Sequence, residues 1–149
     1  MHPKKIAVIG SNSFSGATFV RYLLNRDHDV LGFSRSKEPE DVLLPYKWLD
    51  KGQERFRFEQ ANLNYDLEKL IEILVEEKPN YIVNFSALGM VAQSWEKPED
   101  WYQTNVVAQV KFHNRIRELD FINKYVHVTT PEVYGSTDGW ISEKFDFNP

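Results

Sequence analysis

The stretch that decides the fold reads Lys5-Ile6-Ala7-Val8-Ile9-Gly10-Ser11-Asn12-Ser13-Phe14-Ser15-Gly16. Its first five residues form a short apolar run rich in β-branched side chains, which is typical of a strand buried on both faces of a parallel sheet. Gly10 ends this run, and a helix with one apolar face is predicted over residues 16–25. The stretch therefore predicts a strand, a glycine turn and a helix, the opening unit of an α/β fold.

The same alternation continues along the chain to about residue 130. Further strands are predicted over residues 29–34, 55–58, 81–85 and 125–129, and further helices over residues 65–77 and 99–119. This order predicts one domain over residues 1–149, built on a doubly wound parallel sheet with right-handed connections. Residues 36–53 depart from the pattern. We interpret them as a surface excursion whose Leu, Tyr and Trp side chains cover the sheet edge, with a nucleotide lid or an oligomer contact as alternatives.

Composition excludes several kinds of site. The 149 residues include no cysteine, which rules out disulfides, thiolate zinc sites and a cysteine nucleophile. The four histidines lack metal-ligand spacing, and the net charge of -4 comes without a basic stripe, so neither a metal nor a nucleic-acid partner is expected. No apolar run approaches the roughly 20 residues of a membrane span, and the start lacks a signal-peptide core. We expect a cytoplasmic protein without a membrane partner.

The glycine turn is suited to binding phosphate groups. A turn between the first strand and the first helix presents backbone N–H groups to the pyrophosphate of a dinucleotide. Gly10 would make the tight turn, and Gly16 would let the helix pack closely on the strand. The second strand ends in Ser34-Arg35 rather than in an acid, and an arginine there can pair with a 2′-phosphate, which favours NADP over NAD. An unliganded turn and a solvated arginine are the alternatives.

Five motifs follow one another in a recognisable order. They are Gly10-x-x-Ser13-x-x-Gly16, then Asn62-Leu63, then Asn84-Phe85-Ser86-Ala87, then the set Ser94, Pro98 and Asn105, and finally His127-Val128-Thr129-Thr130-Pro131-Glu132-Val133-Tyr134-Gly135. Together they resemble the extended short-chain dehydrogenase/reductases, the family of sugar-nucleotide epimerases and dehydratases. The last motif is very similar to the strand-five signature of the 4,6-dehydratases. The resemblance covers residues 5 to about 149.

The resemblance implies a Rossmann-like cofactor domain that binds NADP, with NAD as the alternative, and that serves a nucleotide-sugar substrate. It implies a homodimer at full length. The cofactor-binding residues that it implies are Gly10, Ser13, Phe14, Gly16, Ser34, Arg35, Asn62, Leu63, Ser86, Ala87 and Asn105. Asn105 is expected to support backbone and ordered water near the site. In the glycine turn and on the adenine side, two positions depart from the family pattern: Ser13 replaces a glycine, and Asn62 replaces an aspartate, although its amide oxygen can still accept a hydrogen bond.

The strand-five motif implies two catalytic residues. Thr130 would hydrogen-bond the C4 oxygen of the sugar while C4 is oxidised, and Glu132 would then remove the acidified C5 proton as a general base. Loss of water from C6 and return of the hydride to C6 complete a 4,6-dehydration. Pro131 replaces the aspartate that one branch uses as its general acid, so Glu132 would return its proton to the leaving hydroxyl. A decarboxylase, an epimerase and a non-catalytic dinucleotide-binding module remain alternatives.

One pair expected from the resemblance is missing. The family places a Tyr-x-x-x-Lys relay on the helix after the fifth strand, whereas in this chain only Tyr65 and Lys69 have that spacing, on an earlier helix. We interpret them as an ordinary surface pair. The sequence therefore predicts a truncated protein, inactive by itself, that ends before the relay helix and lacks the substrate domain.

Overall fold

Five parallel strands form one sheet in the order β3-β2-β1-β4-β5. A computed structural model describes residues 2–143 and 146–148 of the chain. The strands are β1 (Lys5–Ile9), β2 (Asp29–Ser34), β3 (Phe56–Gln60), β4 (Tyr81–Asn84) and β5 (Lys124–His127). Because β1 lies between β2 and β4, the strand order reverses beside it, which is the switch point of a doubly wound sheet. The predicted fold class is confirmed.

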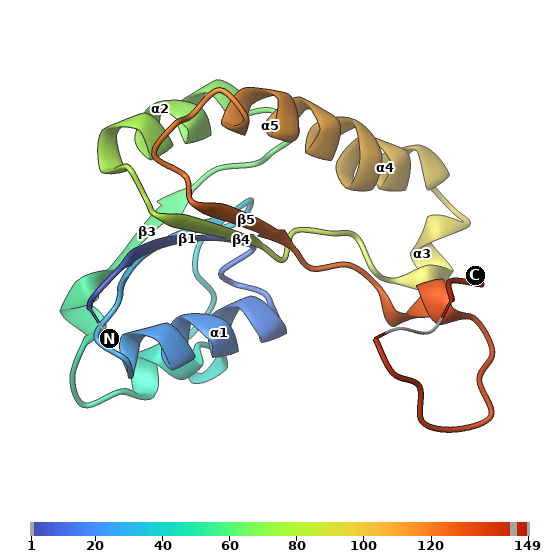
Figure 1. The fold of residues 1–149 in the computed structure, drawn as a ribbon, viewed down its shortest axis with the longest axis horizontal. Helices are drawn as coiled ribbons and strands as arrows, with labels where there is room; N and C mark the ends of the chain where they lie inside the picture. Colours follow the sequence, from blue (N-terminus) through green and yellow to red (C-terminus); the bar gives the residue numbers. More distant parts are fainter. Residues whose placement is uncertain (1, 144–145, 149) are drawn as a thin grey trace.

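Helices cover both faces of this sheet (Figure 1). One face carries α1 (Phe14–Leu24) and two short 3-10 segments, η1 (Asp41–Leu43) and η2 (Pro45–Trp48), and the other carries α2 (Leu67–Glu77) and α5 (Ala108–Ile116). The connection from β4 to α5 holds α3 (Val91–Ser94), α4 (Pro98–Tyr102) and a π-helical turn, η4 (Gln103–Val107). Short 3-10 segments, η3 (Gln53–Arg55) and η5 (Pro131–Tyr134), precede β3 and follow β5. No helix among the described residues is long and apolar enough to cross a bilayer.

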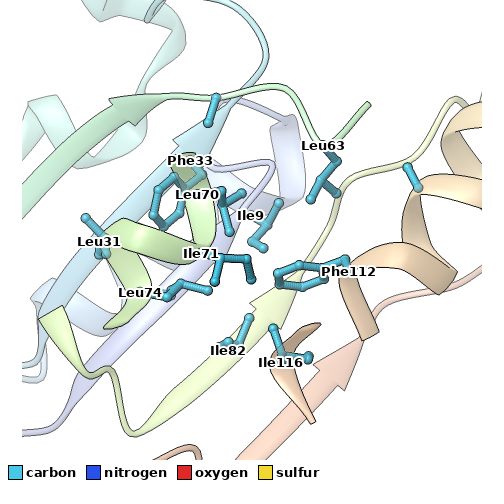
Figure 2. Packing of buried hydrophobic residues seen from close by; sticks show 13 residues of the cluster. Ile9, Leu31, Phe33, Leu63, Leu70, Ile71, Leu74, Ile82, Phe112 and Ile116 are labelled. Atoms are coloured by element: carbon cyan, nitrogen blue, oxygen red, sulfur yellow. The ribbon is translucent and has the colours of Figure 1, made fainter. Parts of the chain in front are cut away.

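Strand β1 is buried on both faces, as its apolar run predicts. Ala7 and Ile9 belong to a core beneath α2 and α5 that includes Phe33, Leu70 and Phe112. Ile9, Phe33, Leu70 and Phe112 are labelled in Figure 2. Ile6 and Val8 point to the opposite face, into a second core formed with α1. Burial of apolar side chains of this size contributes about 1.5–3 kcal/mol each, so the two cores fix the sheet between its helical layers.

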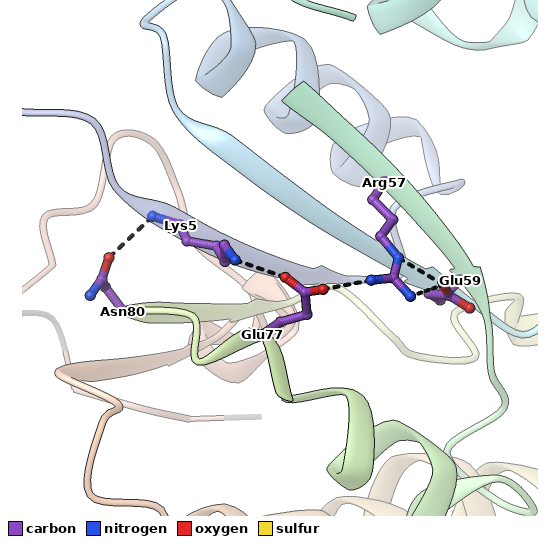
Figure 3. A network of polar contacts seen from close by, with 5 residues as sticks. All are labelled: Lys5, Arg57, Glu59, Glu77 and Asn80. Carbon is purple, nitrogen blue, oxygen red and sulfur yellow. Dashed lines mark hydrogen bonds and ion pairs between the residues drawn. The ribbon is translucent and has the colours of Figure 1, made fainter. Parts of the chain in front are cut away.

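An ion-pair network joins the amino end of the sheet to the end of α2 (Figure 3). The Glu77 carboxylate forms an ion pair with Lys5 Nζ at 2.7 Å and a second ion pair with Arg57 of β3. The Arg57 guanidinium also lies 2.7 Å from a carboxylate oxygen of Glu59. The hydrogen bond from Lys5 is the main reason that the pKa of Glu77 is lowered. Asn80 accepts a hydrogen bond from the Lys5 backbone N–H at 3.1 Å. The network therefore connects the end of α2 to β1 and β3, and Asn80 connects the turn before β4 to β1.

The boundaries of six predicted elements are corrected, three of them by one or two residues: β3 is Phe56–Gln60 rather than 55–58, α2 is Leu67–Glu77 rather than 65–77, and β4 is Tyr81–Asn84 rather than 81–85. The helix predicted over residues 99–119 is instead α4, the π-turn η4 and α5, and it ends at Ile116. The helix predicted to begin at Gly16 begins at Phe14, because the Ser13 side chain caps it. Strand β5 ends at His127 rather than at residue 129, although the Val128 N–H still donates to the Asn84 carbonyl at 2.9 Å.

The excursion over residues 36–53 covers the sheet on the α1 side. Leu44 and Tyr46 are fully buried there, and the Tyr46 ring lies 4.5 Å from the ring of Phe56 in β3. The Tyr46 hydroxyl donates to Glu38 at 2.8 Å, and burial is the main cause of its raised pKa. Trp48 is 54% exposed, so Leu and Tyr, rather than Trp, provide most of the covering surface. The interpretation as a covering excursion is confirmed for these two residues.

Two adjacent leucines test this packing. Leu44 is fully buried, whereas Leu43 is 65% exposed. We expect Leu44→Ala to lower the free energy of unfolding by about 2–5 kcal/mol, because it removes core contacts and leaves a cavity. Leu43→Ala should change it by less than about 0.5 kcal/mol. Urea unfolding followed by circular dichroism measures both variants, and equal effects would contradict the described packing.

Candidate functional site

Two adjoining clefts open at the carboxyl ends of the strands, beside the switch point. The first, of about 270 Å³, lies between the glycine turn, the end of β2, the loop after β3 and the loop after β4. The second, of about 930 Å³, extends from Phe14 to residues 127–132. Ser13 and residues 85–88 line both clefts. A ligand long enough to occupy both would cross the glycine turn, which is where open α/β sheets bind their ligands.

The glycine turn has no room for side chains at its two glycines. Gly10 has a φ of +81°, and an ideal Cβ there would lie 3.0 Å from the Phe85 carbonyl carbon. A Cβ on Gly16 would lie only 2.1 Å from the Gly10 oxygen. The prediction that Gly10 makes the turn and Gly16 permits close packing of helix on strand is confirmed in these geometric terms.

Ser13 occupies the position of the missing glycine as a helix cap. Its φ of -72° is ordinary for any residue, so no glycine is required. Its Oγ donates to the Gly10 carbonyl at 2.7 Å and accepts from the Gly16 N–H at 3.0 Å. Ser13 therefore closes the turn with its own side chain, and the adjacent Phe14 is 91% exposed at the mouth of the second cleft.

The end of β2 presents an arginine to the first cleft. Ser34 is only 7% exposed, and its Oγ accepts a hydrogen bond from the Asn12 N–H at 3.0 Å. The Ser34 hydroxyl thus supports the glycine turn, while Arg35 is exposed and lines the cleft. The Arg35 backbone carbonyl accepts from Gln60 Nε2 at 3.1 Å, which fixes the main chain at this point.

The loop after β3 places Asn62 and Leu63 in the first cleft. The Asn62 amide oxygen, expected as an acceptor on the adenine side, already accepts from the Asn64 N–H at 2.9 Å. The Asn62 backbone N–H donates to Asp66 at 2.8 Å. The side chain thus shapes its own turn, and one oxygen lone pair is left for a ligand. Leu63 is 6% exposed and belongs mainly to the core.

Asn84 joins the loop after β4 to the fold. The side chain is fully buried, and its Oδ1 accepts from the Ser86 N–H at 2.8 Å and from the Ser86 hydroxyl at 2.6 Å. Its Nδ2 donates to Gln109 Oε1 at 2.8 Å and to the Tyr125 hydroxyl at 2.9 Å. All four hydrogen-bonding positions of the amide are used, so Ser86 is held where both clefts meet.

The same hydrogen bonds orient His127. Because the Tyr125 oxygen accepts from Asn84, its hydroxyl proton is free to donate to His127 Nδ1, which lies 2.9 Å away. Burial, followed by the neighbouring imidazole of His113, lowers the pKa of His127 and favours the neutral ring that accepts this bond. Burial also raises the pKa of Tyr125. A neutral His127 ring that accepts this bond at Nδ1 would carry its proton on Nε2, at the edge of the second cleft.

The π-turn η4 directs polar side chains toward both clefts. Asn105 accepts from the Leu88 N–H at 2.9 Å and donates to the Leu88 carbonyl at 3.0 Å, so it supports the backbone as expected. Gln109 Nε2 lies 3.2 Å from the Ser86 carbonyl and 3.3 Å from the Thr104 carbonyl. Neither Gln109 nor Asn12 was singled out from the sequence. The signal in the sequence is a glutamine on the apolar face of a helix, next to Ala108 and three residues before Phe112, both of which are core residues.

Thr130 and Glu132 come together in the second cleft. The Thr130 hydroxyl donates to the Glu132 carboxylate at 2.6 Å, and both side chains are exposed. Ala87 lies in the same cleft.

Tyr65 and Lys69, which have the spacing of the family's relay, lie on the surface and line neither of the two clefts. Lys69 donates to the Gln60 carbonyl at 2.9 Å, and Tyr65 is 83% exposed, as expected of a surface pair. No cluster of three or more His, Asp or Glu side chains that could hold a metal occurs within residues 2–143 and 146–148.

The strand order, the glycine turn and the adjoining clefts define a doubly wound domain of the Rossmann class. Residues 8–149 match the family model described as GDP-mannose 4,6 dehydratase. The chain therefore belongs to this family of sugar-nucleotide dehydratases and epimerases, and the resemblance predicted from the sequence is confirmed.

Curated relatives include several dehydratases. The chain is 28% identical to Protein CapI of Staphylococcus aureus, over 89% of its own length and 39% of that protein. It is 27% identical to GDP-mannose 4,6-dehydratase of Vibrio cholerae, over 89% of its own length and 37% of the relative. The chain thus spans about two fifths of the length of these relatives.

Solved structures share the fold. UDP-glucose-4-epimerase from Stenotrophomonas maltophila, with bound NAD and formylated UDP-arabinopyranose, matches 97% of this chain and 43% of its own, with a TM-score of 0.82 and 16% identity. UDP-N-acetylglucosamine 4-epimerase from Methanobrevibacter ruminantium M1 matches all of this chain and 45% of its own, with a TM-score of 0.76 and 24% identity. At these identities the likeness establishes the fold alone.

The buried amide of Asn84 offers a direct test of the site's framework. In Asn84→Asp the amide donor to Gln109 and Tyr125 is lost, and a buried carboxylate oxygen would face the Gln109 oxygen. We expect the free energy of unfolding to fall by about 3 kcal/mol or more. Asn123→Asp, at an exposed loop position, is the matched control and should change it by less than about 0.5 kcal/mol. Chemical denaturation compares them, and a mild effect at Asn84 would refute the hydrogen-bonding scheme.

Proposed function

We propose that the chain is the cofactor-binding part of an NADP-dependent sugar-nucleotide 4,6-dehydratase. The observation that carries this proposal is the adjacency of two clefts, one bordered by the glycine turn and Arg35, the other by Thr130 and Glu132. The family match and the order of the motifs support it. We further propose a nucleotide-sugar substrate and a homodimer for a protein of the relatives' full length.

The first cleft fits the phosphates of a dinucleotide. Gly10 and Gly16 leave a cradle that a Cβ would fill, and the turn leads into the amino end of α1, where backbone N–H groups favour an anion. Arg35 would pair with the 2′-phosphate of NADP, and Asn62, Leu63, Ser86 and Ala87 would border the rest of the cofactor. When bound, the nicotinamide would supply the hydride acceptor for oxidation of the sugar at C4 and, after loss of water, the hydride donor for reduction at C6.

The second cleft supplies a base and a hydrogen-bond donor. Thr130 would turn its hydroxyl from Glu132 to the substrate's C4 oxygen and thereby favour the carbonyl that develops there. Glu132 would accept the C5 proton, which that carbonyl acidifies. Pro131 has no proton to donate, so the proton held by Glu132 is the one available to the hydroxyl that leaves C6. The two residues lie within hydrogen-bonding distance of one another, which allows these roles to follow in sequence.

Cofactor preference can be measured on the chain itself. We expect isothermal titration to show tighter binding of NADP than of NAD. Arg35→Ala should weaken NADP binding by about 10- to 100-fold, since a charge-assisted contact is lost, and should leave NAD binding nearly unchanged. Arg26→Ala, whose guanidinium stacks on Tyr22 of α1, is the control. If the folded chain bound neither dinucleotide, the cofactor proposal would be wrong.

The reaction is tested on a protein of the relatives' full length. It should convert a nucleotide hexose to a 4-keto-6-deoxy product, and Glu132→Gln should lower turnover by about 10²- to 10⁴-fold, since an amide cannot act as the base. Glu118→Gln, at an exposed carboxylate beyond α5, should leave turnover unchanged. Full turnover in Glu132→Gln would remove this residue as the base. Carbon dioxide release from UDP-glucuronate would indicate a decarboxylase instead.

A further inference from the structure

We propose that Asn12 is a specificity-positioning residue: it ties residues 35–37 to the glycine turn, so that this segment forms a binding site for the phosphate monoester of NADP. The inference rests on the proposed cofactor preference and deepens it. It assigns to Asn12 no contact with the cofactor. Its role would be to hold Arg35 and the neighbouring main chain in the conformation that receives the phosphate.

The Asn12 side chain reaches across to the segment after β2. Its Nδ2 donates to the Ser36 carbonyl at 3.2 Å and to the Lys37 carbonyl at 3.0 Å. Because carbonyl oxygens only accept hydrogen bonds, these two contacts fix which end of the amide faces the segment. Both N–H bonds of the side-chain amide are thereby engaged by residues 24 and 25 positions away in the sequence.

The backbone of Asn12 is held by the end of β2. Its backbone N–H donates to Ser34 Oγ at 3.0 Å, and the side chain of Ser34 is nearly buried beside Ser11. An aspartate at position 34 would place a negative charge next to a bound phosphate, whereas serine supplies the acceptor without the charge. Asn12 therefore connects the turn to the end of β2 at two points, one on each side of Arg35.

A second amide completes the arrangement from β3. Gln60 Nε2 donates to the Arg35 carbonyl at 3.1 Å, so three consecutive carbonyl oxygens, at residues 35, 36 and 37, accept from side-chain amides. Their partial negative charges are thus satisfied away from a ligand. Among the residues that the structure describes, the backbone N–H groups of Ser36 and Lys37 have no hydrogen-bond partner. Unpaired N–H groups next to a guanidinium form a favourable site for an anion.

The test compares two cofactors that differ only in the 2′-phosphate. In Asn12→Ala, titrated with NADP and with NAD, we expect NADP affinity to fall about tenfold or more, because Arg35 and the two N–H groups are no longer preorganised. NAD affinity should change less than about threefold, so the ratio of the two affinities falls. A role confined to the shape of the glycine turn would weaken both cofactors equally, and that result would overturn the proposal.

Two further variants make the test decisive. Gln60→Ala leaves the glycine turn intact and removes only the side-chain hydrogen bond to the Arg35 carbonyl. It should lower the ratio of NADP to NAD affinity, and it can be measured even if Asn12→Ala fails to fold. An unchanged ratio in Gln60→Ala would count against the proposal. Gln53→Ala is the matched control, because Gln53 Nε2 caps the Lys47 and Leu49 carbonyls of the same excursion outside the cleft. It should leave the ratio unchanged.

The outcomes separate this inference from the proposed function. If the unmodified chain prefers NADP and Arg35→Ala abolishes the preference, the cofactor proposal holds, and an unchanged ratio in folded Asn12→Ala overturns the role of Asn12 alone. If the unmodified chain shows no preference for NADP, the cofactor assignment fails first and the inference fails with it.

Discussion

The close approach of helix α1 to strand β1 is the constraint on which the site depends. A Cβ on Gly16 would lie 2.1 Å from the Gly10 oxygen, so the helix can start this near the strand only because residue 16 lacks a side chain. The approach brings the amino end of α1 to the carboxyl edge of the sheet, at the switch point. The pairing of β1 with β4 brings Gly10 against the main chain of Phe85, and the loop after β4 lines the first cleft.

Around this turn, the loops are held by side-chain amides. Asn12 and Gln60 cap the carbonyls after β2, Asn84 holds Ser86, and Asn105 holds Leu88 through both of its backbone groups. An amide can donate and accept at once, so it replaces the pairing that a loop backbone lacks outside helices and strands. Since the donors come from neighbouring elements, the shape of each cleft depends on the packing of the whole sheet.

The sequence predicts the strands because their signals are local: a continuous apolar run marks β1, and two glycines mark the turn, whereas the cap at Ser13 was missed and the helix start was predicted two residues too late. The contacts of Asn12 and Gln109 could not be predicted from the sequence. Their side-chain contacts with Ser36, Lys37 and Ser86 join residues 23 to 25 positions apart, and nothing in the adjacent residues reveals which carbonyl will lie within reach. The π-turn η4 was likewise missed within a continuous helical pattern, and its Asn105 bonds to Leu88, 17 positions away in the sequence.

Pro131 shows how a departure from a family pattern can be structural as well as chemical. Proline disfavours a helical conformation in the residue before it, and Thr130 is extended, with φ of -104° and ψ of 143°. Pro131 then opens the 3-10 turn η5, where its fixed φ suits the first position. This geometry lets the Thr130 hydroxyl accept from the Glu132 N–H at 3.3 Å while donating to the Glu132 carboxylate. Pro131, which cannot donate a proton, thus also preorganises the hydrogen-bonded pair of Thr130 and Glu132.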